Sequence, residues 1–356
     1  MASTSPGYGI TIRVEGSPDV NPVALATTVI TGAGATITAL DVVESLLEKV
    51  VIDITCDTID AEHAEQITAA ISLNSDLTVR KVSDRTFLLH LGGKIEIQSK
   101  VPLKTRDDLS RAYTPGVARI CQAIVADPAD ARRLTIKRNT VAVVTDGSAV
   151  LGLGNIGPAA ALPVMEGKAA LFKRFADVDA WPVCLDTQDV DEIVRTVQLI
   201  APVYGGINLE DISAPRCFEV ERRLRELLDI PVFHDDQHGT AIVVGAAITN
   251  GLKIVGKKIQ DVKLVTSGAG ATALACLDLL VDLGMLVENI WVTDLAGVVY
   301  VGRKELMDPD KDVFAKETSA RTLVEVIEGA DILLGLSAGG VVSQEMVKKM
   351  APNPLV

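Results

Sequence analysis

One glycine-rich segment limits the fold of this chain more than any other feature. Gly268-Ala269-Gly270-Ala271-Thr272-Ala273 follows the apolar run Val262–Thr266, which predicts a strand, and opens a helix that we expect to extend to about Leu283. A dinucleotide site needs this order, because a tight glycine turn brings the pyrophosphate against a helix N-terminus. A second strand, Asn289–Thr293, follows and ends at an acid, Asp294. The pattern predicts a Rossmann-type domain in a parallel α/β fold.

The same segment predicts the cofactor. An acid about 20 residues or more beyond the first glycine binds the ribose hydroxyls of NAD. The carboxylate of Asp294 would also repel the 2′-phosphate of NADP, although Arg303 lies nearby in the sequence. NAD is therefore the expected cofactor, and the alternative is a tight turn in an unrelated α/β domain. The expected cofactor-binding residues are Gly268, Ala269, Gly270, Ala271 and Asp294.

A second glycine match, Gly152 to Gly157, fits a dinucleotide site less well. Pro158 follows it at once, and the next strand candidate, Trp181–Leu185, comes much later. We therefore interpret this segment as a loop of a separate substrate domain.

Two pairs of acids follow short apolar runs. Glu210-Asp211 follows Ile207–Leu209, and Asp235-Asp236 follows Val232–His234. Functional groups gather at the carboxyl ends of parallel strands, so the two pairs can converge on one cation. Ligation by oxygen alone favours Mg²⁺ or Mn²⁺. Glu210-Asp211 by itself could instead be the charged start of a helix, and His234 and His238 are more simply structural residues.

Two further side chains are candidates for proton transfer. Tyr113 lies before a Pro-Gly turn, which would present it from a loop. Lys168 lies within the apolar helix Pro163–Phe172. A buried lysine has a lowered pKa and can act as a base near neutral pH. The alternative for Lys168 is a charged head that reaches solvent.

Residues 8–98 predict a small domain with the order βαββαβ, which is ferredoxin-like. Helices are expected at Val20–Ile30, after Asp19 as a possible N-cap, and at Ala61–Ile71. Strands are expected at Tyr8–Val14, Gly34–Leu40, Val50–Cys56, Leu77–Val82 and Phe87–His90. With its loop Glu15–Asp19 after the first strand, the segment resembles an ACT regulatory domain. The resemblance implies a small-molecule effector, and the alternative is an oligomerisation domain.

Composition excludes several classes of protein. The 356 residues carry a net charge of -13, so the chain lacks the basic surface that binding nucleic acid requires. The five cysteines form no CxxC pair, which indicates a reducing, cytoplasmic setting. The N-terminus has no signal-peptide pattern, and the sequence predicts no apolar run of the roughly 18 residues that a membrane helix needs.

Taken together, the motifs resemble the malic enzymes of the bacterial small-subunit type. The resemblance covers roughly Leu103 to the end. It is carried by 112–117, 145–157, 165–168, 208–211, 234–241 and 267–270. Together with the ACT-like segment, it implies an ACT-like regulatory domain at 1–98, a substrate domain at 99–233 and an NAD domain at 234–356.

The family's chemistry follows from the same resemblance. It is the oxidative decarboxylation of L-malate to pyruvate and CO₂ with NAD. Glu210, Asp211 and Asp236 would hold the divalent metal, Lys168 would be the general base, and Tyr113 the general acid. Asp235 would orient these groups. The resemblance also implies a homo-oligomer.

Two departures from the family pattern stand out. Asn155 replaces the aspartate usual in the stretch Gly152–Gly157. The family also continues beyond Val356 with asparagines that contact substrate and nicotinamide, so the NAD domain is expected to be incomplete. Three hypotheses remain: an active malic enzyme, a malolactic-type enzyme that releases lactate, and a non-catalytic module for effector binding or subunit pairing.

Overall fold

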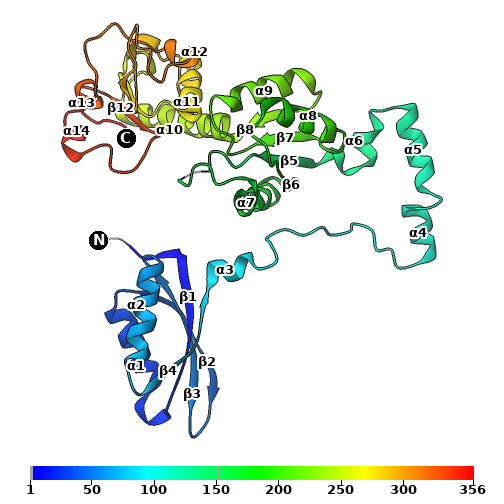
Figure 1. Cartoon of the computed structure of the whole chain (residues 1–356), viewed down its shortest axis with the longest axis vertical. Helices are drawn as coiled ribbons and strands as arrows, with labels where there is room; N and C mark the ends of the chain where they lie inside the picture. The colour runs from blue at the N-terminus through cyan, green and yellow to red at the C-terminus, as the bar shows by residue number, and fades with distance from the viewer. Residues whose placement is uncertain (1–2, 151) are drawn as a thin grey trace. The chain divides into compact units, whose positions relative to one another are not determined.

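The computed structural model describes residues 3–150 and 152–356 (Figure 1). They divide into two compact units between Ile97 and Gln98. Three four-stranded sheets form their centres, one in the first unit and two in the second. Short 3₁₀ turns connect the main elements at Pro18–Val20, Ile136–Arg138, Ala201–Val203, Ile259–Asp261 and Val287–Asn289.

The first unit has the predicted ferredoxin-like order. Its elements are β1 (Ser5–Gly16), α1 (Pro22–Gly32), β2 (Thr36–Ser45), β3 (Val50–Thr58), α2 (Ala61–Ser72), β4 (Leu77–Asp84) and α3 (Arg85–His90). The antiparallel sheet has the strand order β2-β3-β1-β4. Ile30 of α1 and Ile67 of α2 pack on Ile12 and Ile54, so both helices share one core with the sheet. Burying an isoleucine contributes about 1.5–3 kcal/mol, so this core supports the unit.

Two local predictions in this unit are wrong. Phe87–His90 belongs to helix α3 and not to a strand, because Asp84 accepts hydrogen bonds from the backbone N–H groups of Thr86 and Phe87 at 2.8 and 3.0 Å. These bonds start a helix. Helix α1 is capped by Asn21, whose side chain accepts from Ala24 N, and not by Asp19.

The second unit begins with short helices and a parallel sheet. The elements are α4 (Arg106–Ala112), α5 (Val117–Ala126), α6 (Asp130–Leu134), β5 (Thr140–Thr145), α7 (Pro158–Ala176), β6 (Asp179–Cys184), α8 (Val190–Ile200), β7 (Gly206–Leu209), α9 (Arg216–Leu227) and β8 (Val232–His234). The strand order is β6-β5-β7-β8. Helices α8 and α9 bury Ile193 and Leu224 against Leu209 of this sheet. The parallel strands therefore end at one common edge.

A π-helical turn, η4 (Asp235–Gly239), and helix α10 (Thr240–Val255) lead to the second sheet of this unit. The remaining elements are β9 (Leu264–Ser267), α11 (Ala271–Asp282), β10 (Ile290–Asp294), β11 (Gly297–Val298), α12 (Pro309–Asp312), α13 (Leu323–Val326), β12 (Ile332–Gly335) and α14 (Gln344–Lys348). The strand order is β11-β10-β9-β12, with β9 parallel to both β10 and β12. This is the strand, glycine turn and helix arrangement that the sequence predicts.

The segment Asp235–Val255 corrects one sequence-based expectation. It is a helical stretch of 21 residues with a mean hydropathy of 1.2, long and apolar enough by length and composition to cross a membrane. Threonine, asparagine and glycine interrupt its apolar residues, so the sequence shows no unbroken apolar run of that length. Its first residues belong to a polar cluster, and Ile248 and Leu252 pack in the core that includes α11. Only 22% of its most apolar stretch is buried, so the helix packs in this core along one face.

Candidate metal centre and dinucleotide site

The sheet brings the two acid pairs together. β7 and β8 are adjacent and parallel, and Leu209 pairs with His234, so Glu210 and Asp235 follow at the same level. One carboxylate oxygen from each of Glu210, Asp211 and Asp236 lies within 4.8 Å of the others. These are the three residues that the family resemblance implies as metal ligands.

The electrostatics of this cluster favour a cation. Burial, followed by the charge of Asp236, raises the pKa of Glu210 to about 7 and that of Asp211 to about 6. Asp211 Oδ2 is buried and has no hydrogen-bond partner among the described residues. Buried carboxylates of this kind are unfavourable unless a positive charge compensates them. The donor set therefore fits a hard divalent cation.

The backbone conformation of Asp211 is a second indication of a functional site. Its φ of 55° is in the left-handed region, which non-glycine residues rarely adopt. Such strain persists where surrounding contacts enforce it, and it concentrates at functional sites. The backbone N–H of Asp211 donates to Asp236 Oδ2 at 2.8 Å, which fixes the two acids relative to each other.

Lys168 reaches the same cluster from helix α7. Its Nζ lies 2.6 Å from Asp235 Oδ2 and 3.0 Å from Glu210 Oε1, and its side chain is 21% exposed. Burial by itself lowers the pKa of Lys168, but the hydrogen bond to Asp235 and the charge of Glu210 outweigh it, so the pKa is raised. The expectation that burial alone makes this lysine a base is therefore wrong. A base role requires that the charge of its carboxylate partners be compensated.

The fold does not place Tyr113 at the carboxylate cluster. It ends helix α4, and its backbone N–H donates to Leu109 O at 2.9 Å. The residue is 68% exposed, and none of the hydrogen bonds between described residues links its side chain to the carboxylates. Its role as the general acid stays a prediction.

One cavity joins the acid cluster to the glycine turn. It has a volume of about 760 Å³ and is lined by Asp211 and Asp236 on one side and by Gly270, Ala271 and Ser337 on the other. A molecule in this cavity can therefore touch both the proposed metal ligands and the dinucleotide loop.

A neighbouring cavity of about 510 Å³ has the features of an adenosine pocket. It is lined by Gly268, Ala269 and Gly270 of the turn, by Asp294 at the end of β10 and by Lys311. Helix α11 begins at Ala271, so its N-terminus faces the turn, as pyrophosphate binding requires.

The carboxylate of Asp294 is more strongly paired with cations than the sequence suggests. The buried Arg303 forms a two-point ion pair with its carboxylate, with Nη1 donating to Oδ1 at 2.9 Å and Nη2 to Oδ2. Lys311 Nζ lies 3.7 Å from the same carboxylate. These cations compensate the charge of Asp294, so its repulsion of a 2′-phosphate is weaker than expected. The sequence did not single out Lys311, because it lies well beyond the strand that ends at Asp294.

The first glycine match lies in the loop before α7, next to the sheet of β5, as interpreted from the sequence. The backbone N–H groups of Ile156 and Gly157 donate to Gly147 O, each at 3.1 Å. Asn155 Oδ1 accepts a hydrogen bond from Gln188 Nε2 at 3.2 Å. The residue that departs from the family pattern therefore holds the loop to the segment before α8.

We expect Gly268→Ala to damage the dinucleotide turn. Gly268 has a φ of 118°, and a Cβ there would overlap the carbonyl oxygen of Leu336. The left-handed backbone alone costs about 1–3 kcal/mol for a side-chain-bearing residue. Thermal unfolding without cofactor should show this loss. Gly270→Ala is the matched control, because a Cβ there meets nothing within 4 Å; equal destabilisation by both changes would contradict the prediction.

We expect Mn²⁺ binding to weaken as the pH falls. Protons compete with the cation at Glu210 and Asp211, whose pKa values are raised to about 7 and about 6. Without metal these two carboxyls bind more protons in the folded chain than in the unfolded chain from about pH 4 to about 7. Their contribution to stability should therefore fall as the pH rises through this window. Titration of the metal-free chain with Mn²⁺ at pH 5.5, 6.5 and 7.5 tests this, and an affinity independent of pH would argue against the cluster.

The comparisons with known proteins agree with this geometry. Residues 92–225 match the malic enzyme N-terminal domain, and residues 237–354 match the malic enzyme NAD-binding domain. An NAD-dependent malic enzyme of Geobacillus stearothermophilus is 53% identical over 352 residues, which are 98% of this chain and 73% of that protein. A bifunctional malic/malolactic enzyme of Bacillus subtilis is 52% identical over 268 residues, covering 74% of this chain and 65% of that protein.

A solved structure gives the same result. The crystal structure of an NAD-dependent malic enzyme from Thermotoga maritima aligns with a TM-score of 0.73 and 45% identity. The alignment covers 76% of this chain and 73% of that one. With a relative that is 53% identical over 98% of its length, and with both malic enzyme domains matched, the chain belongs to the malic enzyme family.

Proposed function

We propose that the chain oxidises L-malate with NAD and releases pyruvate and CO₂, with a divalent metal held by Glu210, Asp211 and Asp236. The observation that carries this proposal is the single cavity that joins Asp211 and Asp236 to the glycine turn. Oxidation of an alcohol by a nicotinamide requires that the carbon bearing the hydroxyl reach both sites. A Mg²⁺ or Mn²⁺ ion would supply Lewis-acid polarisation of the substrate oxygens.

The residues of the chain then have distinct roles. Lys168 removes the proton of the C2 hydroxyl while hydride leaves C2 for NAD. Asp235 orients the lysine through its 2.6 Å hydrogen bond. The resulting 2-keto acid loses its distal carboxylate as CO₂, and Tyr113 donates a proton to C3 to give pyruvate. Base and acid roles of this kind typically contribute factors of about 10²–10⁴ each.

Product analysis tests the proposed reaction. The purified chain is incubated with L-malate, NAD and Mn²⁺, and NADH, pyruvate and lactate are measured together. We expect NADH and pyruvate in equal amounts. Lactate without net NADH would instead support the malolactic hypothesis, and no product at all would support the non-catalytic one.

We further propose that the active form is a homo-oligomer in the cytoplasm. The exposed position of Tyr113 supports a homo-oligomer. As the general acid, Tyr113 must reach the carboxylate cluster either by movement of its own helix or from a second copy of the chain. Mixing Tyr113→Phe chains with Lys168→Met chains distinguishes these alternatives. Turnover is restored only if Tyr113 of one copy serves the site that contains Lys168 of the other copy. The five free cysteines support a reducing compartment.

The first unit is proposed to bind a small-molecule effector as an ACT-like domain. Its ferredoxin-like sheet order supports this assignment. Calorimetry of the whole chain with amino acids and with acyl-CoA metabolites tests it, and an absence of heat would favour a role in subunit pairing.

A further inference from the structure

Helix α9 buries one charged side chain in an otherwise apolar face. Cys217, Val220 and Leu224 are its other buried residues, and they pack in the core around β7. Glu221 lies on this same face and is only 6% exposed. A buried carboxylate is costly unless it is paired, so its partners indicate why the position is not apolar.

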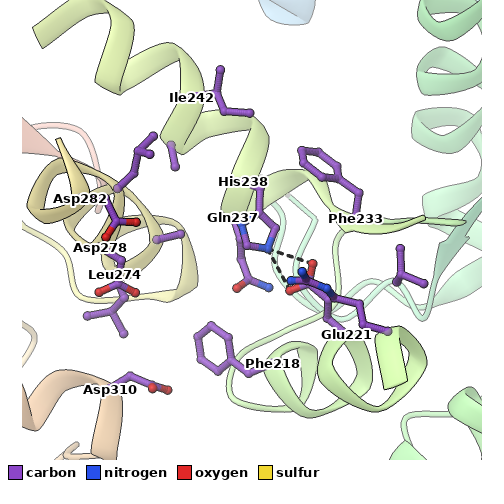
Figure 2. A pocket seen from close by; sticks show the side chains of 15 residues that line it. Phe218, Glu221, Phe233, Gln237, His238, Ile242, Leu274, Asp278, Asp282 and Asp310 are labelled. Carbon is purple, nitrogen blue, oxygen red and sulfur yellow. Dashed lines mark hydrogen bonds and ion pairs between the residues drawn. The ribbon is translucent and has the colours of Figure 1, made fainter. Parts of the chain in front are cut away.

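Both partners of Glu221 come from one short segment. The backbone N–H of His234 donates to Glu221 Oε1 at 3.1 Å. His238 Nε2 donates to the same carboxylate, at 2.9 Å from Oε1 and 3.0 Å from Oε2. Figure 2 shows the carboxylate and the imidazole facing each other on the wall of a cavity of about 530 Å³.

The segment between these two contacts contains Asp235 and Asp236. It is the π-helical turn η4, a rare geometry that is frequent at functional sites. Asp235 binds Lys168, and Asp236 accepts from the backbone of Asp211. Glu221 therefore holds the turn at both ends, just outside the two acids that the site uses.

We propose that Glu221 is a positioning residue for the metal centre, acting together with His238. The buried carboxylate fixes η4 so that Asp236 faces Glu210 and Asp211 while Asp235 faces Lys168. The inference rests on the proposed function, because it assumes that these acids hold the metal. Hydrogen-bond partners behind metal ligands typically change metal affinity by about 10–100-fold when they are removed.

Mn²⁺ binding to the metal-free full chain, followed by the EPR signal of free Mn²⁺, tests this role without any turnover. We expect Glu221→Leu to weaken binding about 10-fold or more. Glu221→Gln keeps a carbonyl acceptor for His234 N–H and should restore most of the affinity. Glu219→Leu is the matched control, because Glu219 is on the same helix, is 52% exposed and, among the described residues, pairs only with Arg223.

Kinetics provide a second measurement, which a merely structural role of Glu221 would leave unchanged. Glu221→Leu should lower kcat and raise the Mn²⁺ requirement, while the KM for NAD stays unchanged, since the hydrogen bonds of Glu221 go to His234 and His238 and not to the glycine turn. If Glu221→Leu fails to fold, His238→Leu removes the imidazole contact with Glu221 at a partly exposed position and should also weaken Mn²⁺ binding.

The outcomes separate the two proposals. Wild-type affinity in folded Glu221→Leu, or in His238→Leu where the first variant does not fold, would overturn the positioning role. Equal weakening by Glu219→Leu would overturn it as well. If the wild-type chain binds no Mn²⁺, the proposed metal site fails first. If the wild-type chain binds Mn²⁺ and Asp236→Asn abolishes binding, the metal site stands whatever Glu221→Leu shows.

Discussion

Replacing Lys168 by methionine should lower kcat by about 1000-fold, within the range typical of a lost general base. Methionine keeps most of the length of the side chain but cannot accept the hydroxyl proton. Lys168 lies within hydrogen-bond distance of Asp235 and beside Glu210, so its loss removes the basic nitrogen from the cluster. NADH formation at saturating malate, NAD and Mn²⁺ measures the effect.

Two further variants define what the lysine does. Lys173→Met on the same helix is the matched control, because Lys173 is exposed and pairs with Asp177 and Asp179 away from the cluster. It should keep nearly full activity. Lys168→Arg keeps the positive charge but cannot give up its proton, so it should be as slow as methionine. Full turnover by the arginine variant would show that Lys168 supplies charge and not proton transfer.

Asp236→Asn should weaken Mn²⁺ binding by more than about 100-fold, which exceeds the usual effect of removing a group behind a ligand. The change removes one of the three converging carboxylates and its negative charge. It also weakens the acceptor for Asp211 N–H, which orders the neighbouring acid. Calorimetric titration of the metal-free variant with Mn²⁺ measures the loss.

The control for this change is Asp229→Asn. Asp229 is almost fully exposed and lies 3.8 Å from Arg132, so its neutralisation removes the same single negative charge without touching the cluster. Its Mn²⁺ affinity should equal that of the wild type. Retained affinity in Asp236→Asn would exclude this residue as a ligand and would require a different metal site.

The main features of the site were predictable because they follow from local rules. A strand that ends in acids, next to a parallel strand that ends in acids, places Glu210 and Asp236 at one edge of a sheet. The glycine turn was predictable for a similar reason, since Gly268 needs a backbone that other residues avoid. Each of these patterns lies within a few consecutive residues of the sequence.

Features that depend on distant residues were not predictable. Burial lowers the pKa of Lys168, but Asp235, which is 67 positions away in the chain, and Glu210 together raise it, so the direction of the shift is opposite to that expected from burial alone. The charge of Asp294 is compensated by Arg303, which the sequence placed nearby but could not orient.

Two further features could not be established from the sequence alone. Glu221 gave one usable signal, a charged residue at an inward position of an apolar helix face, but its partners become visible only in the fold. The division of the second unit at residue 233 stays a prediction, because residues 98–356 form one compact unit.

Anomalous scattering from crystals grown with Mn²⁺ tests the central claim most directly, because it locates the ion without reference to activity. We predict a peak between the carboxylates of Glu210, Asp211 and Asp236, in the cavity that also contains the glycine turn. A peak at other residues, or none at Mn²⁺ concentrations that saturate turnover, would contradict a metal centre formed by these three acids.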